Sequence, residues 1–132
     1  MSNFGKAIVE LDGVTYSSTE RAYQAAKWQP EDRFFFVECS NEEAIKYNRD
    51  HLPNGYSSES WDKIKIDVMY DLLKQKFNCE QNPENYHKLI DTGEKYLEET
   101  NWWNDTFWGK NLKNEGQNIL GILLMTIREN LK

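Results

Sequence analysis

The stretch that decides the fold is Tyr-Ser-Ser-Thr-Glu-Arg-Ala-Tyr-Gln-Ala-Ala-Lys, which covers residues 16–27. Ser17 and Glu20 have the spacing of a Ser-x-x-Glu capping box, in which a hydroxyl and a carboxylate bond to backbone amides at the start of a helix. Pro30 follows closely, and the residue before a proline avoids the helical region. We therefore expect a helix that begins at this box, runs through Lys27 and stops just before Pro30.

Regular patterns extend on both sides of this stretch. Residues 8–16 predict a β-hairpin, because two short runs of β-branched and aromatic residues flank Asp12-Gly13, a strong turn signal. Residues 33–39 fit a helix or a strand, and their Phe-Phe-Phe-Val run is expected to be buried in either case. Capping residues, prolines and apolar spacing predict further helices over about residues 41–50, 60–77, 83–92 and 119–131. The last of these is apolar nearly all round, so we expect it to be the central buried helix.

These elements predict an α+β, helix-dominated fold, in one compact domain over residues 1–132 with a small N-terminal β-hairpin. A chain of 132 residues has the usual size of one domain. The formal net charge of −6 argues against a protein that holds duplex DNA or RNA through its phosphates. A local cluster of Lys and Arg is still compatible with a phosphorylated small molecule.

Residue usage favours a cytoplasmic protein without a metal or another cofactor. No apolar run approaches the roughly 20 residues that cross a bilayer, so we expect no membrane partner. Residues 1–5 lack the charged and apolar parts of a signal peptide. Cys39, Cys79, His51 and His87 match no metal-binding spacing.

A polar row on the first predicted helix is the leading candidate for chemistry. Glu20, Tyr23, Gln24 and Lys27 are spaced at i, i+3, i+4 and i+7, which places them on one helix face. A packed helix more often has an apolar stripe in such a row. In one interpretation the row is catalytic; in the other, Glu20 closes the capping box and Lys27 is a solvated lysine. The spacing alone favours the second interpretation.

Two loops before the last helix are the other candidates. Residues 101–109 hold four large aromatic side chains among Asn and Asp, which fits either a ligand site or an aromatic lid over the core. Residues 109–118 contain glycines and lead into a helix N-terminus, where backbone amides can bind an anion. This second loop matches neither a P-loop nor a dinucleotide fingerprint.

Short motifs follow one another in a fixed order along almost the whole chain. They are residues 2–4, 11–13, 16–27, Trp61, 68–69, 76–77, 92–93, 97–98, the pattern Asp105-x-x-Trp108-Gly109, and residues 116–128. Together they resemble the NADAR/YbiA-like family, and this resemblance implies an N-glycosidase that cleaves the bond between a ribose C1′ carbon and a base nitrogen. It also reverses the balance between the two interpretations of Glu20 and Lys27.

The resemblance implies two substrate classes. One is ADP-ribose attached to guanine, in nucleic acid or in a nucleotide, and we favour it because the N-terminus is short and the loop after Trp108 is basic. The alternative is a ribosylamino-pyrimidine phosphate of riboflavin synthesis. Two alternatives belong to other functional classes. One is a module that binds NAD or ADP-ribose without cleaving it, and the other is a purely structural helical domain. The expected partner is thus a phosphorylated ribosyl or ADP-ribosyl substrate, which includes modified nucleic acid but no stably bound duplex.

By similarity to the family, the expected catalytic residues are Glu20, Lys27 and Asp105. A cleaved C1′–N bond passes through an oxocarbenium-like ribose that Glu20 would stabilise, or Glu20 would activate water. Lys27 would attack C1′ as a neutral amine, or remain charged and serve the base or a phosphate. Asp105 would bind ribose hydroxyls or orient Lys27. The expected substrate-binding residues are Asn3, Phe4, Tyr23, Gln24, Trp61, Trp108, Gly109, Lys110 and Asn118.

Three features depart from the family pattern. Arg21 stands where many members have His, which argues against an acid role for that position. The loop from Trp108 to Asn118 has fewer glycines than usual, so we expect Lys110 and Lys113 to compensate in phosphate binding. The sequence also begins at the first motif, so we expect a minimal version of the domain without the short strand that usually precedes it.

Overall fold

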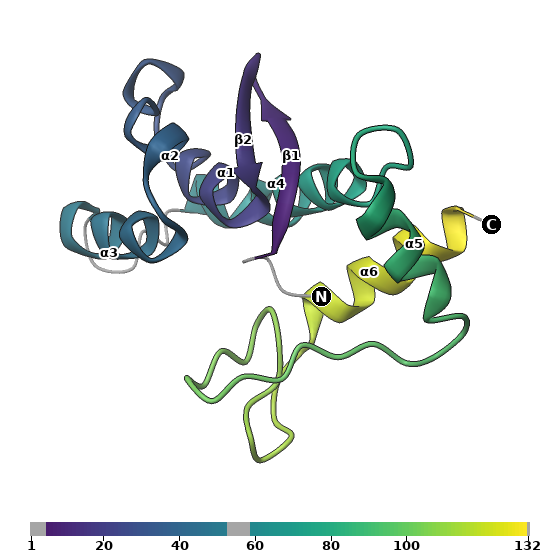
Figure 1. Cartoon of the computed structure of the whole chain (residues 1–132). Coiled ribbons are helices and arrows are strands. Elements are labelled where there is room, and N and C mark those ends of the chain that lie inside the picture. The colour runs from purple at the N-terminus through teal and green to yellow at the C-terminus, as the bar shows by residue number, and fades with distance from the viewer. Residues whose placement is uncertain (1–4, 53–58, 132) are drawn as a thin grey trace.

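Figure 1 shows the computed structural model of the chain, which describes residues 5–52 and 59–131. The elements in chain order are β1 (Lys6–Leu11), β2 (Val14–Ser18), α1 (Thr19–Ala25), the short 3-10 helix η1 (Pro30–Asp32), α2 (Phe35–Glu38), α3 (Asn41–His51), α4 (Glu59–Lys76), α5 (Pro83–Asp91) and α6 (Ile119–Asn130). The predicted fold class, helix-dominated with an N-terminal hairpin, is confirmed.

The hairpin turns at the predicted residues. Asp12 and Gly13 have φ angles of +49° and +83°, as a two-residue turn that matches the twist of its strands requires. β1 and β2 are antiparallel, with Val9 opposite Tyr16, and both of these side chains are buried. They face α1 and α4, so one side of the hairpin covers the helices (Figure 1).

α1 is the most deeply placed helix among the described elements. Six of its seven residues are buried, because the hairpin, α2, α3 and α4 all pack around it. The prediction that residues 119–131 form the central buried helix is wrong. Leu120 and Leu124 of α6 are buried, but Ile122 on the opposite side is 48% exposed, and the main helix contacts of α6 are with α4 and α5.

The start and the end of α1 differ from the prediction by one or two residues. Ser18, not Ser17, is the N-cap, and its Oγ accepts a hydrogen bond of 3.2 Å from the backbone amide of Arg21. Glu20 therefore stands one position too early to close a capping box, and its carboxylate is left for other contacts. The helix ends at Ala25, so Lys27 lies in the turn that follows it.

A reciprocal capping box does occur, at α3. Ser40 accepts from the Glu43 amide at 3.0 Å, and the Glu43 carboxylate accepts from the Ser40 amide at 3.0 Å. The cap is thus one residue before the expected Asn41. Residues 35–38 form the short α2, and only Phe36 of the aromatic run is buried, while Phe34 is 79% exposed. The expectation that the whole run is buried is wrong, because a single helical turn directs successive side chains to different sides.

A long segment without helices connects α5 to α6. Its one regular contact in the described residues is a parallel bridge between Thr100 and Lys110. In Figure 1 this segment, drawn in green to yellow, extends below α4 and the hairpin. No described helix is long and apolar enough to cross a membrane.

Candidate active site

A pocket of about 490 Å³ lies where α1, α3 and the start of α4 meet. Its lining residues are Tyr23, Gln24, Lys27, Ile45, Asn48, Arg49, Leu52, Trp61, Asp62 and Lys65. Tyr23, Gln24, Lys27 and Trp61 were all predicted to contact substrate or to carry chemistry. A second hollow of about 520 Å³, between the hairpin and α5, contains none of the predicted residues.

Gln24 connects the predicted carboxylate to the predicted amine. Its Nε2 donates to Glu20 Oε1 at 2.9 Å, and its Oε1 accepts from Lys27 Nζ at 3.0 Å. Asn48 Nδ2 donates to the same Gln24 Oε1 at 2.8 Å and to the Gln24 carbonyl at 3.0 Å. Because the oxygen of the amide faces two donors, its nitrogen must face an acceptor, which Glu20 supplies. The network therefore fixes the Gln24 side chain in one orientation.

Glu20 is 9% exposed and is not among the residues that line the pocket. It is connected to the pocket through its hydrogen bond with Gln24, which does line it. One helical turn separates it from Gln24, so the two side chains meet on one face as the sequence predicted. Its negative charge acts on two groups of the pocket: it raises the pKa of Tyr23 and opposes the fall in the pKa of Lys27. The carboxylate is thus electrostatically part of the pocket.

Lys27 reaches the pocket although α1 ends before it. Its Nζ lies 5.3 Å from the Tyr23 ring centre and 6.0 Å from that of Trp61. Burial lowers the pKa of Lys27, the Glu20 carboxylate partly offsets this, and the charge of Lys65 lowers it further. Lys27 is therefore not the fully solvated lysine of the alternative interpretation.

Three aromatic rings form one side of this region. The Tyr23 ring lies 5.4 Å from Trp61, and Trp108 meets it edge-on at 5.7 Å. Burial, and then the Glu20 charge, raise the pKa of Tyr23 well above its ordinary value. Tyr23 accordingly keeps its phenolic proton at neutral pH and can donate a hydrogen bond.

Asp105 holds the loop that carries Trp108. Its Oδ1 accepts from the backbone amides of Phe107 at 3.0 Å and of Trp108 at 2.9 Å. The Asp105 charge also contributes to the raised pKa of Tyr23, so the carboxylate is near the phenol. In the structure Asp105 acts on the loop backbone and positions Trp108; its expected contact with ribose hydroxyls stays a prediction.

A model of the NADAR domain matches residues 1–132, the whole of the sequence. This chain belongs to the NADAR domain family.

Among similar NADAR proteins, the N-glycosidase YbiA of Escherichia coli is 33% identical over 131 residues, which cover 98% of this chain and 79% of that protein. The solved NMR structure of E. coli YbiA matches with a TM-score of 0.81 at 32% identity, over 98% of this chain and 76% of that one. A riboflavin biosynthesis protein of Vibrio vulnificus is 29% identical, and this chain spans only 35% of its length. A chloroplastic riboflavin biosynthesis protein of maize is 32% identical, with 23% of its length spanned.

The other predicted site residues of this NADAR chain have structural roles or lie outside the residues that the structure describes. Asn118 Oδ1 accepts from the Glu99 amide at 3.0 Å, and its Nδ2 donates to the Leu97 carbonyl at 3.0 Å. A Cβ added to Gly109 would lie 2.2 Å from the Glu99 carbonyl oxygen, so glycine permits this close approach. Lys110 Nζ lies 3.5 Å from a Glu98 oxygen, and Lys110 is not among the described lining residues.

The expected anion cradle at the start of α6 is not formed. The backbone amides of Gln117, Asn118, Ile119 and Leu120 donate to the carbonyls of residues 106–109 at 2.8–3.3 Å. These amides are therefore used to attach the loop to the helix. The signal for an anion site was local in sequence, whereas the competing acceptors come from the loop's own fold.

Arg21, which departs from the family pattern, stabilises the start of α1. Its Nη1 donates to the Cys39 carbonyl at 2.8 Å, and its Nε donates to Ser18 Oγ at 3.1 Å.

Asn3 and Phe4 lie outside the described residues, so their predicted contacts stay predictions. Asn48, Arg49 and the other α3 residues were missed by sequence reasoning. Asn48 is 5% exposed, and its contacts with Gln24 join two helices, so the sequence carried no local signal for it.

Proposed function

We propose that this chain is an N-glycosidase that hydrolyses the C1′–N bond between ADP-ribose and guanine, and so restores the unmodified base. The observation that carries the proposal is the Glu20–Gln24–Lys27 network beside an aromatic pocket. Similarity to proteins named N-glycosidase YbiA supports the bond type. The choice of an ADP-ribosyl substrate rests on the basic residues that line the pocket.

Glu20 supplies the negative charge that this reaction needs. As the C1′–N bond stretches, positive charge develops on the ribose ring, and a fixed carboxylate in a water-poor site stabilises it. The hydrogen bond from Gln24 at 2.9 Å keeps one carboxylate oxygen oriented without neutralising it. Glu20 is the group on which we expect the rate to depend most.

Lys27 fits two routes. In the first, its neutral amine attacks C1′, the base leaves with the bonding electrons, the ribose ring opens to an imine, and water then releases the sugar. In the second, Glu20 takes a proton from water, the water oxygen attacks C1′, and charged Lys27 gives a proton to the departing base. The lowered pKa of Lys27 increases its neutral fraction and favours the first route.

The cations of the pocket favour a diphosphate over a single phosphate. Two basic residues besides the reacting Lys27 line it, Arg49 of α3 and Lys65 of α4. Arg49 is 69% exposed at its side chain and so can move toward an anion, while Lys65 is held by Asp62 at 3.2 Å. The volume of about 490 Å³ is within the usual range of small-molecule pockets, roughly 300–1,000 Å³.

The second candidate substrate is a ribosylamino-pyrimidine phosphate. The riboflavin biosynthesis proteins of Vibrio vulnificus and maize favour it by name, although this chain matches only 35% and 23% of their lengths. The bond cleaved is again C1′–N, so Glu20 and Lys27 would act in the same way. The two candidates differ in the number of phosphates that the pocket must hold.

The test compares turnover of ADP-ribosyl-guanosine with turnover of the ribosylamino-pyrimidine phosphate, using wild type and Arg49→Gln. We expect a higher kcat/KM for ADP-ribosyl-guanosine, and a loss of about tenfold in Arg49→Gln that appears in KM. Faster turnover of the pyrimidine compound, unaffected by Arg49→Gln, would select the second candidate. Calorimetric binding of ADP-ribose without any product would instead indicate a non-catalytic module.

A further inference from the structure

Two exposed tryptophans stand on the same loop as Trp108. We infer that Trp102 and Trp103 form a stacking platform for bases that flank the modified guanine in single-stranded nucleic acid. This inference rests on the proposed function and extends it, because it makes a strand, rather than a free nucleotide, the preferred form of the substrate.

The platform is exposed, and hydrogen bonds hold the backbone turn that carries it. Trp102 is 78% exposed and Trp103 is 58% exposed, and their rings meet edge-on with centres 5.8 Å apart. Beneath them Asn101 is 3% exposed: its Nδ2 donates to the Asp105 carbonyl and its Oδ1 accepts from the Asp105 amide, each at 2.8 Å. These reciprocal bonds close a short turn with the two indoles at its tip. The backbone of this turn is therefore ordered before a ligand binds, which lowers the entropy cost of binding there.

The same turn is attached to the pocket. Asp105 fixes the amides of Phe107 and Trp108, and Trp108 meets the Tyr23 ring. Lys65, which lines the pocket, has its Nζ 4.1 Å from the Phe107 ring centre. Trp108 is five positions after Trp103, so their Cα atoms are at most roughly 18 Å apart, the length of about five stacked nucleotides.

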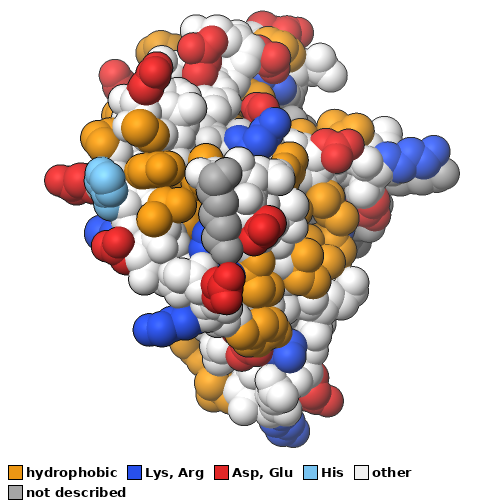
Figure 2. All heavy atoms as spheres, turned by 90° about the vertical axis from the view of Figure 1, so that its right-hand side faces the viewer, with side chains coloured by type: hydrophobic (Ala, Val, Ile, Leu, Met, Phe, Trp, Pro, Cys, Tyr) orange, Lys and Arg blue, Asp and Glu red, His pale blue; other side chains and the backbone are white. Residues whose placement is uncertain are grey.

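Stacking explains why tryptophan is placed at this tip in an acidic protein. Base–aromatic stacking contributes about 1–3 kcal/mol per base and tolerates any sequence, because every base has a flat face. The net charge of −6 disfavours a grip that depends on phosphates. On the face in Figure 2, acidic, basic and hydrophobic side chains are interspersed and form no continuous basic surface. Stacking on bases does not require the acidic protein surface to approach many phosphates, and so avoids the repulsion between like charges.

A second copy of the chain or another protein is a poorer occupant. The two indoles together expose at most roughly 350 Å², well below the roughly 800 Å² that each partner of a stable protein complex buries. Their neighbours at the tip are polar, including Asn104, whose φ of +64° completes the turn. A narrow aromatic tip of this kind suits flat ligands better than a broad interface.

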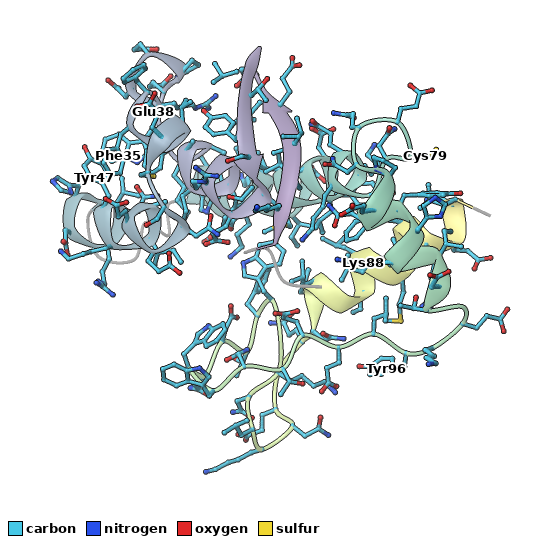
Figure 3. All side chains as sticks on the ribbon, viewed as in Figure 1. Phe35, Glu38, Tyr47, Cys79, Lys88 and Tyr96 are labelled. Atoms are coloured by element: carbon cyan, nitrogen blue, oxygen red, sulfur yellow. The ribbon has the colours of Figure 1, made fainter. Side chains whose placement is uncertain are left out.

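The first experiment measures binding of a labelled, unmodified pyrimidine-rich DNA single strand by fluorescence anisotropy. We expect Trp102→Ala/Trp103→Ala to weaken binding at least tenfold. Phe34→Ala is the matched control, because Phe34 is 79% exposed but adjoins Phe35, which Figure 3 shows beside α3 and away from the loop. Wild-type affinity should fall by less than about tenfold between 50 and 200 mM salt, since few phosphates are neutralised.

The second experiment compares kcat/KM for an ADP-ribosylated single strand and for ADP-ribosyl-guanosine. The double variant should lose at least tenfold on the strand and remain within about twofold of wild type on the nucleoside. Equal loss on both substrates, or no loss on either, would overturn the platform. A third result would also overturn it: the double variant binds the strand as wild type does, but loses a dimer that wild type forms. If wild type cleaves neither substrate, the proposed function fails, and the binding experiment still decides the platform.

Discussion

Gln24 donates to Glu20 at 2.9 Å and thereby places a neutral amide between the carboxylate and the amine of Lys27. Without it, the two charged groups could collapse into an ion pair that would neutralise the carboxylate and fix Lys27 as a cation. With it, Glu20 remains available to a developing positive charge and Lys27 keeps a lowered pKa.

The first prediction concerns Glu20→Gln. Glutamine can still accept the Gln24 hydrogen bond but carries no charge, so we expect kcat to fall by about 10²–10⁴ with stability nearly unchanged. Steady-state kinetics and urea unfolding measure the two quantities. Near-normal turnover in a folded variant would remove Glu20 from the mechanism.

Gln24→Glu tests the role of the amide. The new carboxylate still accepts from Lys27 and Asn48, but it places a like charge beside Glu20. A like charge raises the pKa of Glu20, and the same carboxylate, as an opposite charge, raises the pKa of Lys27. A limb of the kcat profile that either group governs should therefore move to higher pH, by about one unit or more. Gln24→Met, which removes the polar contacts without adding charge, is the control and should lower kcat without that movement. An unmoved profile in Gln24→Glu would show that neither Glu20 nor Lys27 governs it.

Lys27 should be trapped during turnover. Borohydride reduces an imine to a stable amine, so mass spectrometry of digested wild type should find a reduced ADP-ribosyl adduct on the peptide that contains Lys27, and none in Lys27→Arg. Because the neutral amine reacts and its pKa is lowered, the rate should rise with pH and level off below the ordinary lysine value of 10.5. Activity without any adduct would select the water route.

Gly109→Ala is expected to destabilise the fold. The new Cβ would lie 2.2 Å from the Glu99 carbonyl oxygen and 2.9 Å from Asn101 Nδ2, so the Thr100–Lys110 bridge must shift. Overpacking of this kind costs about 1–3 kcal/mol. Gly93→Asn is the control: it has a φ of +63°, which Asn tolerates, and no atom within 4 Å of its Cβ position. Equal urea midpoints for the two variants would contradict this packing role.

Lys76 provides a pH test that is separate from the site. Its side chain is 3% exposed, and burial lowers its pKa to about 8, against an opposing contribution from Glu99. Between pH 8 and about 10.4 the unfolded chain holds this proton and the folded chain does not, so stability gained from Lys76 rises with pH there. Lysine Cε carbon shifts should reveal one residue that titrates near pH 8 and is absent in Lys76→Met. Titration of every lysine near its ordinary value would contradict the burial argument.

Local signals were sufficient for the fold class and for part of the site. Asp12-Gly13 needs positive φ angles that few dipeptides tolerate, and the i, i+4 spacing of Glu20 and Gln24 brings them together in any helix. The sequence did not resolve a shift of one residue, since Ser17 and Ser18 are equally good N-cap residues and strand β2 continues to Ser18.

Other parts of the site depend on contacts that sequence spacing does not encode. Asn48 reaches Gln24 from another helix, 24 residues away. The amides before α6 bond to carbonyls of their own loop, which only the folded loop reveals. Lys27 keeps its predicted place near Glu20, although α1 ends first, because its long side chain reaches back to Gln24.

The most direct test of the glycosidase account is the mass of the products from ADP-ribosyl-guanosine. Incubation with wild type should give guanosine at its unmodified mass together with intact ADP-ribose, and Glu20→Gln should give neither at a comparable rate. Two results would contradict hydrolysis of the C1′–N bond by this site. One is cleavage at the diphosphate, with AMP and a phosphoribosyl-guanosine as products, and the other is an equal amount of product from Glu20→Gln.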